Sequence, residues 1–281
     1  MNERERGVLV GALGRPRYEV VPVGGAEDLV LAHLSKDVKV TATVSPRRGI
    51  DHTLDFCERL RKEGFTVVPH LSARLLRDLT HLAAILDRLR EAGIHELFVV
   101  GGDIDEPIGD FPGADALLVA MSKMGHHLHE IGIAGYPESH PLIDDDVTIQ
   151  AMWDKRRHAT HIVSQICFRP KTIGEWVRRI RRRGVDLPVY VGIPGVVDAR
   201  KLLRIAAKTG VGESARFLSR HRSWFLRLAF PGGYSPDRLI RGLLPYMVEP
   251  RNAIAGFHVY TFNELIATER WRRHTLERLT S

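Results

Sequence analysis

FTVVPHL, residues 65–71, reads as a strand without a polar face. ELFVVGG (96–102) and THIVSQICF (160–168) have the same character, because apolar residues occupy both faces instead of alternating with polar ones. Strands of this kind are typical of a parallel sheet that is covered by helices. The three segments therefore predict buried parallel strands and a fold of the α/β class.

Outward from these segments, strand and helix patterns alternate along the chain. Helical periodicity covers DHTLDFCERLRKEG (51–64) and LLRDLTHLAAILDRLREAG (75–93), which close on Gly64 and Gly93. Eight strands are predicted, and they end near Val21, Thr43, His70, Gly102, Gly135, Gln165, Gly192 and Tyr260.

Eight parallel strands in a chain of 281 residues fit a (β/α)8 TIM barrel. No linker rich in Pro, Gly or Ser divides the sequence, so we predict a single TIM-barrel catalytic domain over residues 1–281. A doubly wound open sheet is the alternative. The characteristic motif of that fold is missing from the sequence, because no G-x-G-x-x-G follows the first strand.

Composition and charge indicate where the protein is located and which partners it binds. No apolar run approaches the ~18 residues of a membrane span, and the charged N-terminus has no signal core, which predicts a cytoplasmic protein without a membrane partner. Cys57 and Cys167 are predicted to be reduced packing residues. The net charge of +7 favours anionic partners. We interpret the basic run RRIRRRG (178–184) as a solvated helix end and predict no nucleic-acid partner.

Three acidic or histidine-rich clusters resemble metal sites but favour other interpretations. In GHHLHE (125–130) only one pair of histidines shares a helix face. DDD (144–146) is placed to open a helix, where carboxylates stabilise the first turn. DIDEPIGD (103–110) lacks the spacing of a calcium loop. No metal site is predicted.

Polar residues close most of the predicted strands. In a TIM barrel the carboxyl ends of the strands surround the active site, so these residues are expected to share one mouth. GIAGYPESHP (132–141) supplies Tyr136, Glu138 and His140 there. The other strand-end residues are Glu19, Thr43, His70, Asp103, Gln165, Tyr260, Thr261 and Asn263.

Glu19 is the sharpest candidate for a chemical role. It lies in YEVVPV (18–23), where its neighbours in the strand are apolar or aromatic. A carboxylate among apolar groups has its charged form disfavoured, which would let Glu19 donate a proton near neutral pH. The alternative makes Glu19 an ion-pair partner of Arg15 or Arg17.

Six strand-end motifs together resemble those of the methylenetetrahydrofolate reductase family, over a range from about Tyr18 to Asn263. The motifs are VVPHLSA (67–73), VGGD (100–103), GYPESHP (135–141), VSQICF (163–168), GIPG (192–195) and FHVYTFN (257–263). The resemblance implies a TIM barrel that reduces 5,10-methylenetetrahydrofolate to 5-methyltetrahydrofolate with a hydride from a nicotinamide.

The resemblance also implies roles for single residues. Glu19 would protonate the folate, and Asp103, Gln165 and Tyr260 would bind this substrate. The positions that match the cofactor-binding residues of the family, with Lys155 near the flavin phosphates, are Thr43, His70, Gly102, Tyr136, His140 and Lys155.

Several departures from the family pattern concern the flavin. An arginine of the family is Gly101 here, its TYGA motif reads TVSP (43–46), and Asp154 stands where a second arginine is expected. Gaining an anion beside a diphosphate weakens its binding. We therefore predict direct hydride transfer from NADH or NADPH without bound FAD. The alternatives are a two-step relay through FAD and a non-catalytic barrel that binds a reduced folate or RNA. Residues 212–239 receive no role.

Overall fold

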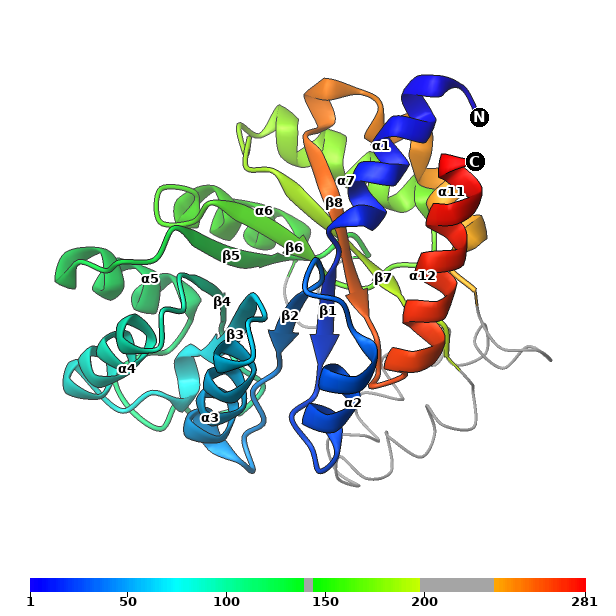
Figure 1. The fold of residues 1–281 in the computed structure, drawn as a ribbon. Coiled ribbons are helices and arrows are strands. Elements are labelled where there is room, and N and C mark those ends of the chain that lie inside the picture. Colours follow the sequence, from blue (N-terminus) through cyan, green and yellow to red (C-terminus); the bar gives the residue numbers. More distant parts are fainter. Residues whose placement is uncertain (139–143, 198–234) are drawn as a thin grey trace.

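The chain folds into a closed barrel of eight parallel strands, seen in a computed structural model that describes residues 1–138, 144–197 and 235–281 (Figure 1). The predicted TIM barrel is confirmed, and each predicted strand end falls within two residues of the observed one. The strands are β1 (Arg17–Val20), β2 (Lys39–Ala42), β3 (Val67–Ser72), β4 (Glu96–Val100), β5 (Glu130–Gly135), β6 (His161–Ser164), β7 (Val189–Pro194) and β8 (Ile254–Tyr260).

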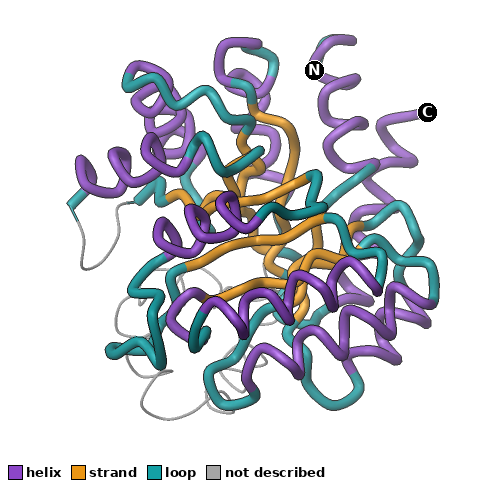
Figure 2. The backbone as a smooth tube through the Cα atoms, turned by 90° about the vertical axis from the view of Figure 1, so that its left-hand side faces the viewer, coloured by secondary structure: helices purple, strands orange, loops and turns teal. Residues whose placement is uncertain are grey.

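Helices surround the strands (Figure 2). α3 buries a stripe of apolar residues at helical spacing, which includes Ile50, Leu54, Cys57 and Leu60. The two helices predicted over 51–64 and 75–93 are observed as α3 and α4, and Gly64 and Gly93 follow them with positive φ. The described helices are α1 (Glu3–Gly14), α2 (Ala26–His33), α3 (Gly49–Lys62), α4 (Leu79–Glu91), α5 (Ala114–Met124), α6 (Asp145–Lys155), α7 (Pro170–Arg182), α11 (Asp237–Met247) and α12 (Leu265–Thr280).

The barrel closes where β8 pairs with β1. Glu19 lies opposite Tyr260 in this pair and opposite Thr41 in the pair of β1 with β2. The N-terminal helix α1 packs against α12, so both chain ends lie at the same end of the molecule (Figure 1, Figure 2). Residues far apart in the sequence thus meet around β1.

The apolar residues form two separate groups. The larger group lies between the strands and the helices. The smaller group consists of Val68, Phe98 and Val163, and it fills the inside of the barrel because alternate residues of each strand point inward. This inner layer leaves room for polar side chains above and below it.

Charged residues occupy the amino-terminal end of the barrel, a layer we call the floor: Arg17, Lys39, Glu96 and Glu130. Arg17 is 1% exposed and pairs with Glu130 and Glu96, while Lys39 Nζ lies 2.6 Å from Glu96 Oε1. The guanidinium of Arg17 also stacks on the ring of Tyr190, at 4.3 Å from its centroid. A buried cation is tolerated here because Glu130 accepts its hydrogen bond and Glu96 lies within ion-pair distance.

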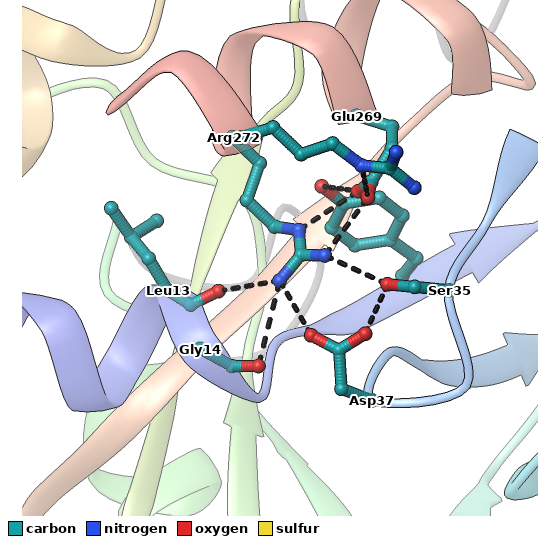
Figure 3. Close-up of polar contacts among 8 residues, drawn as sticks. Leu13, Gly14, Ser35, Asp37, Glu269 and Arg272 are labelled. Atoms are coloured by element: carbon teal, nitrogen blue, oxygen red, sulfur yellow. Dashed lines mark hydrogen bonds and ion pairs between the residues drawn. The ribbon is translucent and has the colours of Figure 1, made fainter. Parts of the chain in front are cut away.

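A buried ion-pair network fixes α12 to the barrel (Figure 3). Arg272, which is 3% exposed, donates to both carboxylate oxygens of Glu269 at 2.8 Å. It also donates to Asp37 Oδ2 at 2.9 Å and to the carbonyl oxygen of Leu13 at 3.0 Å. Tyr18 Oη donates to Glu269 at 3.3 Å, so the network reaches the outer face of β1.

Most arginines of the basic run in α7 contact other residues of the chain. Arg179 pairs with Asp145 at 2.7 Å, and Arg183 pairs with Asp146. Arg181 donates to the carbonyl oxygen of Asn252. These contacts agree with the interpretation of a helix end. Among the described helices, none is both long and apolar enough to cross a membrane.

Both cysteines are free and buried, as predicted. Burial raises the pKa of the Cys167 thiol to about 12, so it stays protonated and unreactive at neutral pH. Within residues 1–138, 144–197 and 235–281, no three His, Cys, Asp or Glu side chains are grouped so that they could hold a metal ion.

Candidate active site

Glu19 lies at the carboxyl end of β1 and faces into the barrel. Its Oε2 lies 3.2 Å from Nε2 of His258, on the neighbouring strand β8. The Glu19 side chain is 18% exposed and that of His258 is 1% exposed, so the carboxyl reaches the mouth while the imidazole lies beneath it. Arg17, the alternative partner, pairs with Glu130 and Glu96 in the floor instead.

His258 is a site residue that the sequence analysis did not single out. It lies two residues before Tyr260 in FHVYTFN, and residues two apart in a strand share a face. This spacing is the signal that could have placed His258 beside the other inward-facing residues. Its pairing with Glu19 has no sequence signal, because the two residues are 239 positions apart.

His70 lies on β3 in the same part of the barrel. It is buried, its ring meets Phe98 edge-on at 4.8 Å, and its centroid lies 6.4 Å from that of His258. Burial lowers the pKa of His70 to about 4, although the nearby charge of Glu19 acts in the opposite direction. His70 is therefore uncharged at pH 7 and lines the site.

Acid should destabilise the folded chain through its buried histidines. Burial lowers the pKa of His70 to about 4 and that of His161, inside the barrel, to about 3, against 6.5 in the unfolded chain. Below pH 6.5 the unfolded chain binds protons that the folded histidines do not, so stability falls as the pH falls. Between pH 7 and pH 5 we expect a loss of about 2 kcal/mol for each histidine.

Denaturant unfolding of His70→Gln at both pH values checks this expectation. The variant should lose about 2 kcal/mol less than the original chain between pH 7 and pH 5. His274→Gln, at an exposed position in α12, serves as the matched control and should keep the original pH dependence. An unchanged pH dependence in His70→Gln would contradict the expectation.

Tyr260 is the last residue of β8, and Tyr136 directly follows β5. Burial raises the pKa of Tyr260, and the negative charge of Glu19 adds to this effect. Burial likewise raises the pKa of Tyr136, with Asp103 as the additional cause. Both phenols are therefore neutral donors, and Tyr260 Oη donates to the carbonyl oxygen of Ser164 at 3.2 Å.

Gln165 directly follows β6 at the mouth. Its peptide N–H donates to the carbonyl oxygen of Gly135 at 2.7 Å, and its side-chain oxygen accepts from the N–H of Ile166 at 2.9 Å. The amide plane is thus held by its own loop. The turn is tight, since a Cβ on Gly192 of the next strand would lie 2.2 Å from the carbonyl oxygen of Ser164.

Gly102 and Asp103 begin the loop after β4. Gly102 has a φ of +106°, and a Cβ there would lie 2.2 Å from Ser72 Oγ, so only glycine fits. Arg74 supports the loop by donating to the carbonyl oxygens of Ile104 and Pro112, each at 2.9 Å. Asp103 itself is exposed.

Thr43, the next strand-end residue, follows β2. Its peptide N–H donates to the carbonyl oxygen of Val20 at 3.0 Å, which ties it to the end of β1. Its own carbonyl oxygen accepts from Thr53 Oγ1 at 3.0 Å. Thr43 thus lies next to the strand that carries Glu19.

One predicted site residue, Lys155, lies apart from this group. Lys155 is the last residue of α6, outside the barrel, and burial lowers its pKa against the opposing charges of Asp115 and Asp154. His140 lies outside the described residues. The structure therefore brings together Glu19, His70 and Tyr260 around His258. Thr43, Gly102, Asp103, Tyr136 and Gln165 lie just after neighbouring strands.

The fold and the site define a class of protein: a TIM barrel with a carboxyl group, two buried histidines and two half-buried phenols toward the carboxyl ends of its strands. Residues 29–222, more than half of the chain, match the family described as methylenetetrahydrofolate reductase. The chain belongs to this family, and the resemblance carried by its motifs is confirmed.

Individual relatives cover smaller parts of the sequence. Methylenetetrahydrofolate reductase 2 of Saccharomyces cerevisiae is 30% identical over 110 residues, which are 38% of this chain and 18% of that protein. "Probable methylenetetrahydrofolate reductase (NADPH)" of Caenorhabditis elegans is 25% identical over 177 residues, which are 60% and 25% of the two proteins. The chain thus spans a quarter or less of the length of these curated relatives.

One solved structure shares the fold along its whole length. It is an uncharacterized protein from Clostridium thermocellum that binds two copies of 5-methyl-5,6,7,8-tetrahydrofolic acid. The TM-score is 0.58, with 98% of this chain and 99% of that chain covered at 9% identity. At this identity the likeness concerns the barrel fold alone.

Proposed function

We propose that this chain reduces 5,10-methylenetetrahydrofolate to 5-methyltetrahydrofolate, with a hydride that comes directly from NADH or NADPH. Membership of the family supports the reaction class. The observation that carries the proposal is the Glu19 carboxyl, which lies at the barrel mouth, partly exposed, with a buried histidine on one of its oxygens.

Glu19 would act as the acid that opens the five-membered ring of the substrate. The proton passes to nitrogen 10, the bond between that nitrogen and the methylene carbon breaks, and a cation remains on nitrogen 5 and this carbon. The hydride then adds to the carbon, which becomes the methyl group, and the nicotinamide is oxidised. Solvent returns the proton to Glu19. Positioned proton transfer of this kind contributes about 100-fold or more.

The neighbouring polar residues would orient the pterin. Asp103, exposed at the start of its loop, and Gln165, whose amide plane is held by the loop after β6, suit the donors and acceptors on a pterin edge. Tyr260 lies opposite Glu19 in the pairing of β1 with β8 and offers an aromatic face. Holding the reacting carbon toward the nicotinamide supplies much of the remaining acceleration.

The residues fit a flavin poorly, which is why the proposal does without one. Lys155 is the cation that the family pattern assigns to the flavin phosphates. Here burial lowers its pKa, and the carboxylates of Asp115 and Asp154 act on it. Burial disfavours the charged form of this lysine, which makes it a weak partner for a diphosphate. The arginine expected before Gly102 is Gly101, so a second cation is missing.

A small anionic molecule is the proposed partner, and the cytoplasm the proposed location. The arginines of α7 that pair with Asp145, Asp146 and the carbonyl oxygen of Asn252 are not free to contact a nucleic-acid backbone. We propose that residues 1–281 form one catalytic barrel domain.

An absorbance spectrum of the purified chain and a nicotinamide oxidation assay test the proposal. We expect no flavin absorbance, and oxidation of NADH or NADPH that requires 5,10-methylenetetrahydrofolate and yields 5-methyltetrahydrofolate. Flavin bound in near-stoichiometric amount would favour the two-step relay through FAD. No oxidation with either nicotinamide, together with binding of the reduced folate, would favour a non-catalytic folate-binding barrel.

A further inference from the structure

We propose that His258 is a positioning residue for Glu19, and that it holds Oε2 of the carboxyl so that Oε1 carries the proton toward the substrate. The inference rests on the proposed acid role of Glu19. It starts from the contact of 3.2 Å between His258 Nε2 and Glu19 Oε2.

The location of the ring nitrogens decides which of them carries the hydrogen. Nδ1 of His258 is buried and has no hydrogen-bond partner among the described residues. Buried N–H groups without an acceptor are rarer in folded proteins than bare acceptors. We therefore assign the hydrogen to Nε2, where it points at Glu19 Oε2. The carboxyl is then fixed at one oxygen, and the other is free to hold the transferable proton.

The surroundings of His258 keep its ring in place. Tyr260 meets the ring edge-on with centroids 4.9 Å apart, and His70 lies on another side at 6.4 Å. Arg17, opposite His258 in the strand pairing, is held by the carboxylates of the floor. The titratable and charged groups that face His258 are Glu19, Arg17, His70, His161 and Tyr260.

The segment after His258 also holds the backbone on which Glu19 is carried. Thr261 Oγ1 donates to the carbonyl oxygen of Glu19 at 2.5 Å. Asn263 accepts from the N–H of Val21 and donates to its carbonyl oxygen, both at 2.9 Å. Phe262 and Asn263 have φ values of +51° and +60°, which residues other than glycine seldom adopt. This turn makes the contacts possible, so β8 holds the side chain of Glu19 and the segment after β8 holds its main chain.

Replacement of His258 by leucine and by glutamine tests the proposal. A glutamine amide can still donate to Oε2, whereas leucine cannot. We expect His258→Leu to lower kcat roughly 10- to 50-fold, with little change in the KM of the folate, and His258→Gln to recover most of the loss.

The pH profile separates positioning from a merely structural effect. A hydrogen bond donated to a carboxylate favours its ionised form. Without the donor, the alkaline limb of kcat should move to higher pH in His258→Leu and stay in place in His258→Gln. The isosteric variant Thr261→Val should lower kcat several-fold, with recovery in Thr261→Ser, and it leaves the imidazole untouched.

The controls distinguish the two proposals. Circular dichroism and binding of 5-methyltetrahydrofolate report whether each variant is folded, and the exposed His274→Gln should match the original chain. If the original chain is active but His258→Leu keeps its kcat and its pH profile, the positioning proposal fails and the proposed function stands. If the original chain oxidises neither nicotinamide in the presence of the folate substrate, both proposals fail.

Discussion

Glu19→Gln is expected to lower kcat by about 100-fold or more while the chain still binds 5-methyltetrahydrofolate with nearly its original affinity. Glutamine has the size of glutamate and can still contact Nε2 of His258 across the observed 3.2 Å. It has no acidic proton to give to nitrogen 10 of the substrate, so ring opening loses its catalyst. Steady-state oxidation of the nicotinamide and calorimetric binding of 5-methyltetrahydrofolate measure the two properties separately.

The control for Glu19→Gln is a variant that removes a carboxyl outside the candidate site. Glu27→Gln removes a carboxyl from a surface ion pair with Arg59, at 2.6 Å, and should leave kcat unchanged. Full activity in Glu19→Gln would end the acid role. Loss of turnover and of folate binding in equal measure would instead assign Glu19 to binding.

Arg272→Met is expected to lower the free energy of unfolding by about 3–5 kcal/mol, as found when one partner of a buried ion pair is removed. Methionine fills a similar length but leaves Glu269, which is 4% exposed, without its bidentate partner (Figure 3). Asp37 and the carbonyl oxygen of Leu13 lose a donor at the same time. Urea denaturation followed by circular dichroism measures the change.

Arg273→Met is the matched control, because Arg273 contacts the same carboxylate at 2.7 Å but is 55% exposed. Solvent screens an exposed pair, so the loss should stay within about 1 kcal/mol. Similar losses in the two variants would show that burial of Arg272 does not set the stability of the network.

The strands and their order could be predicted because their signal is local. The apolar runs at 65–71, 96–102 and 160–168 identify buried parallel strands, and the glycines after α3 and α4 end the helices. Helix α1 escaped prediction because residues 3–14 mix charged and apolar residues with little sidedness, and only Leu9, Ala12 and Leu13 are buried.

The site could be predicted as a set of strand ends, but its pairings could not. Arg17 and Glu19 share a face of β1 but lie about 6.6 Å apart along it, one layer from each other. Arg17 therefore meets the acids of the floor, and Glu19 meets His258. These partners lie on other strands, and a single sequence does not show which residues of two strands lie opposite each other. Lys155 was assigned by motif matching alone, and its position at the end of α6 depends on how that helix packs.

The floor determines from which end of the barrel reactants can reach the site. Arg17 and its carboxylate partners block one end with ion pairs, so molecules enter and leave by the opposite opening. When two reactants bind through the same opening and one lies deeper, the outer reactant blocks binding and release of the inner one. For the proposed reaction we therefore expect an ordered kinetic sequence, in which the reactant that binds deeper arrives first and departs last.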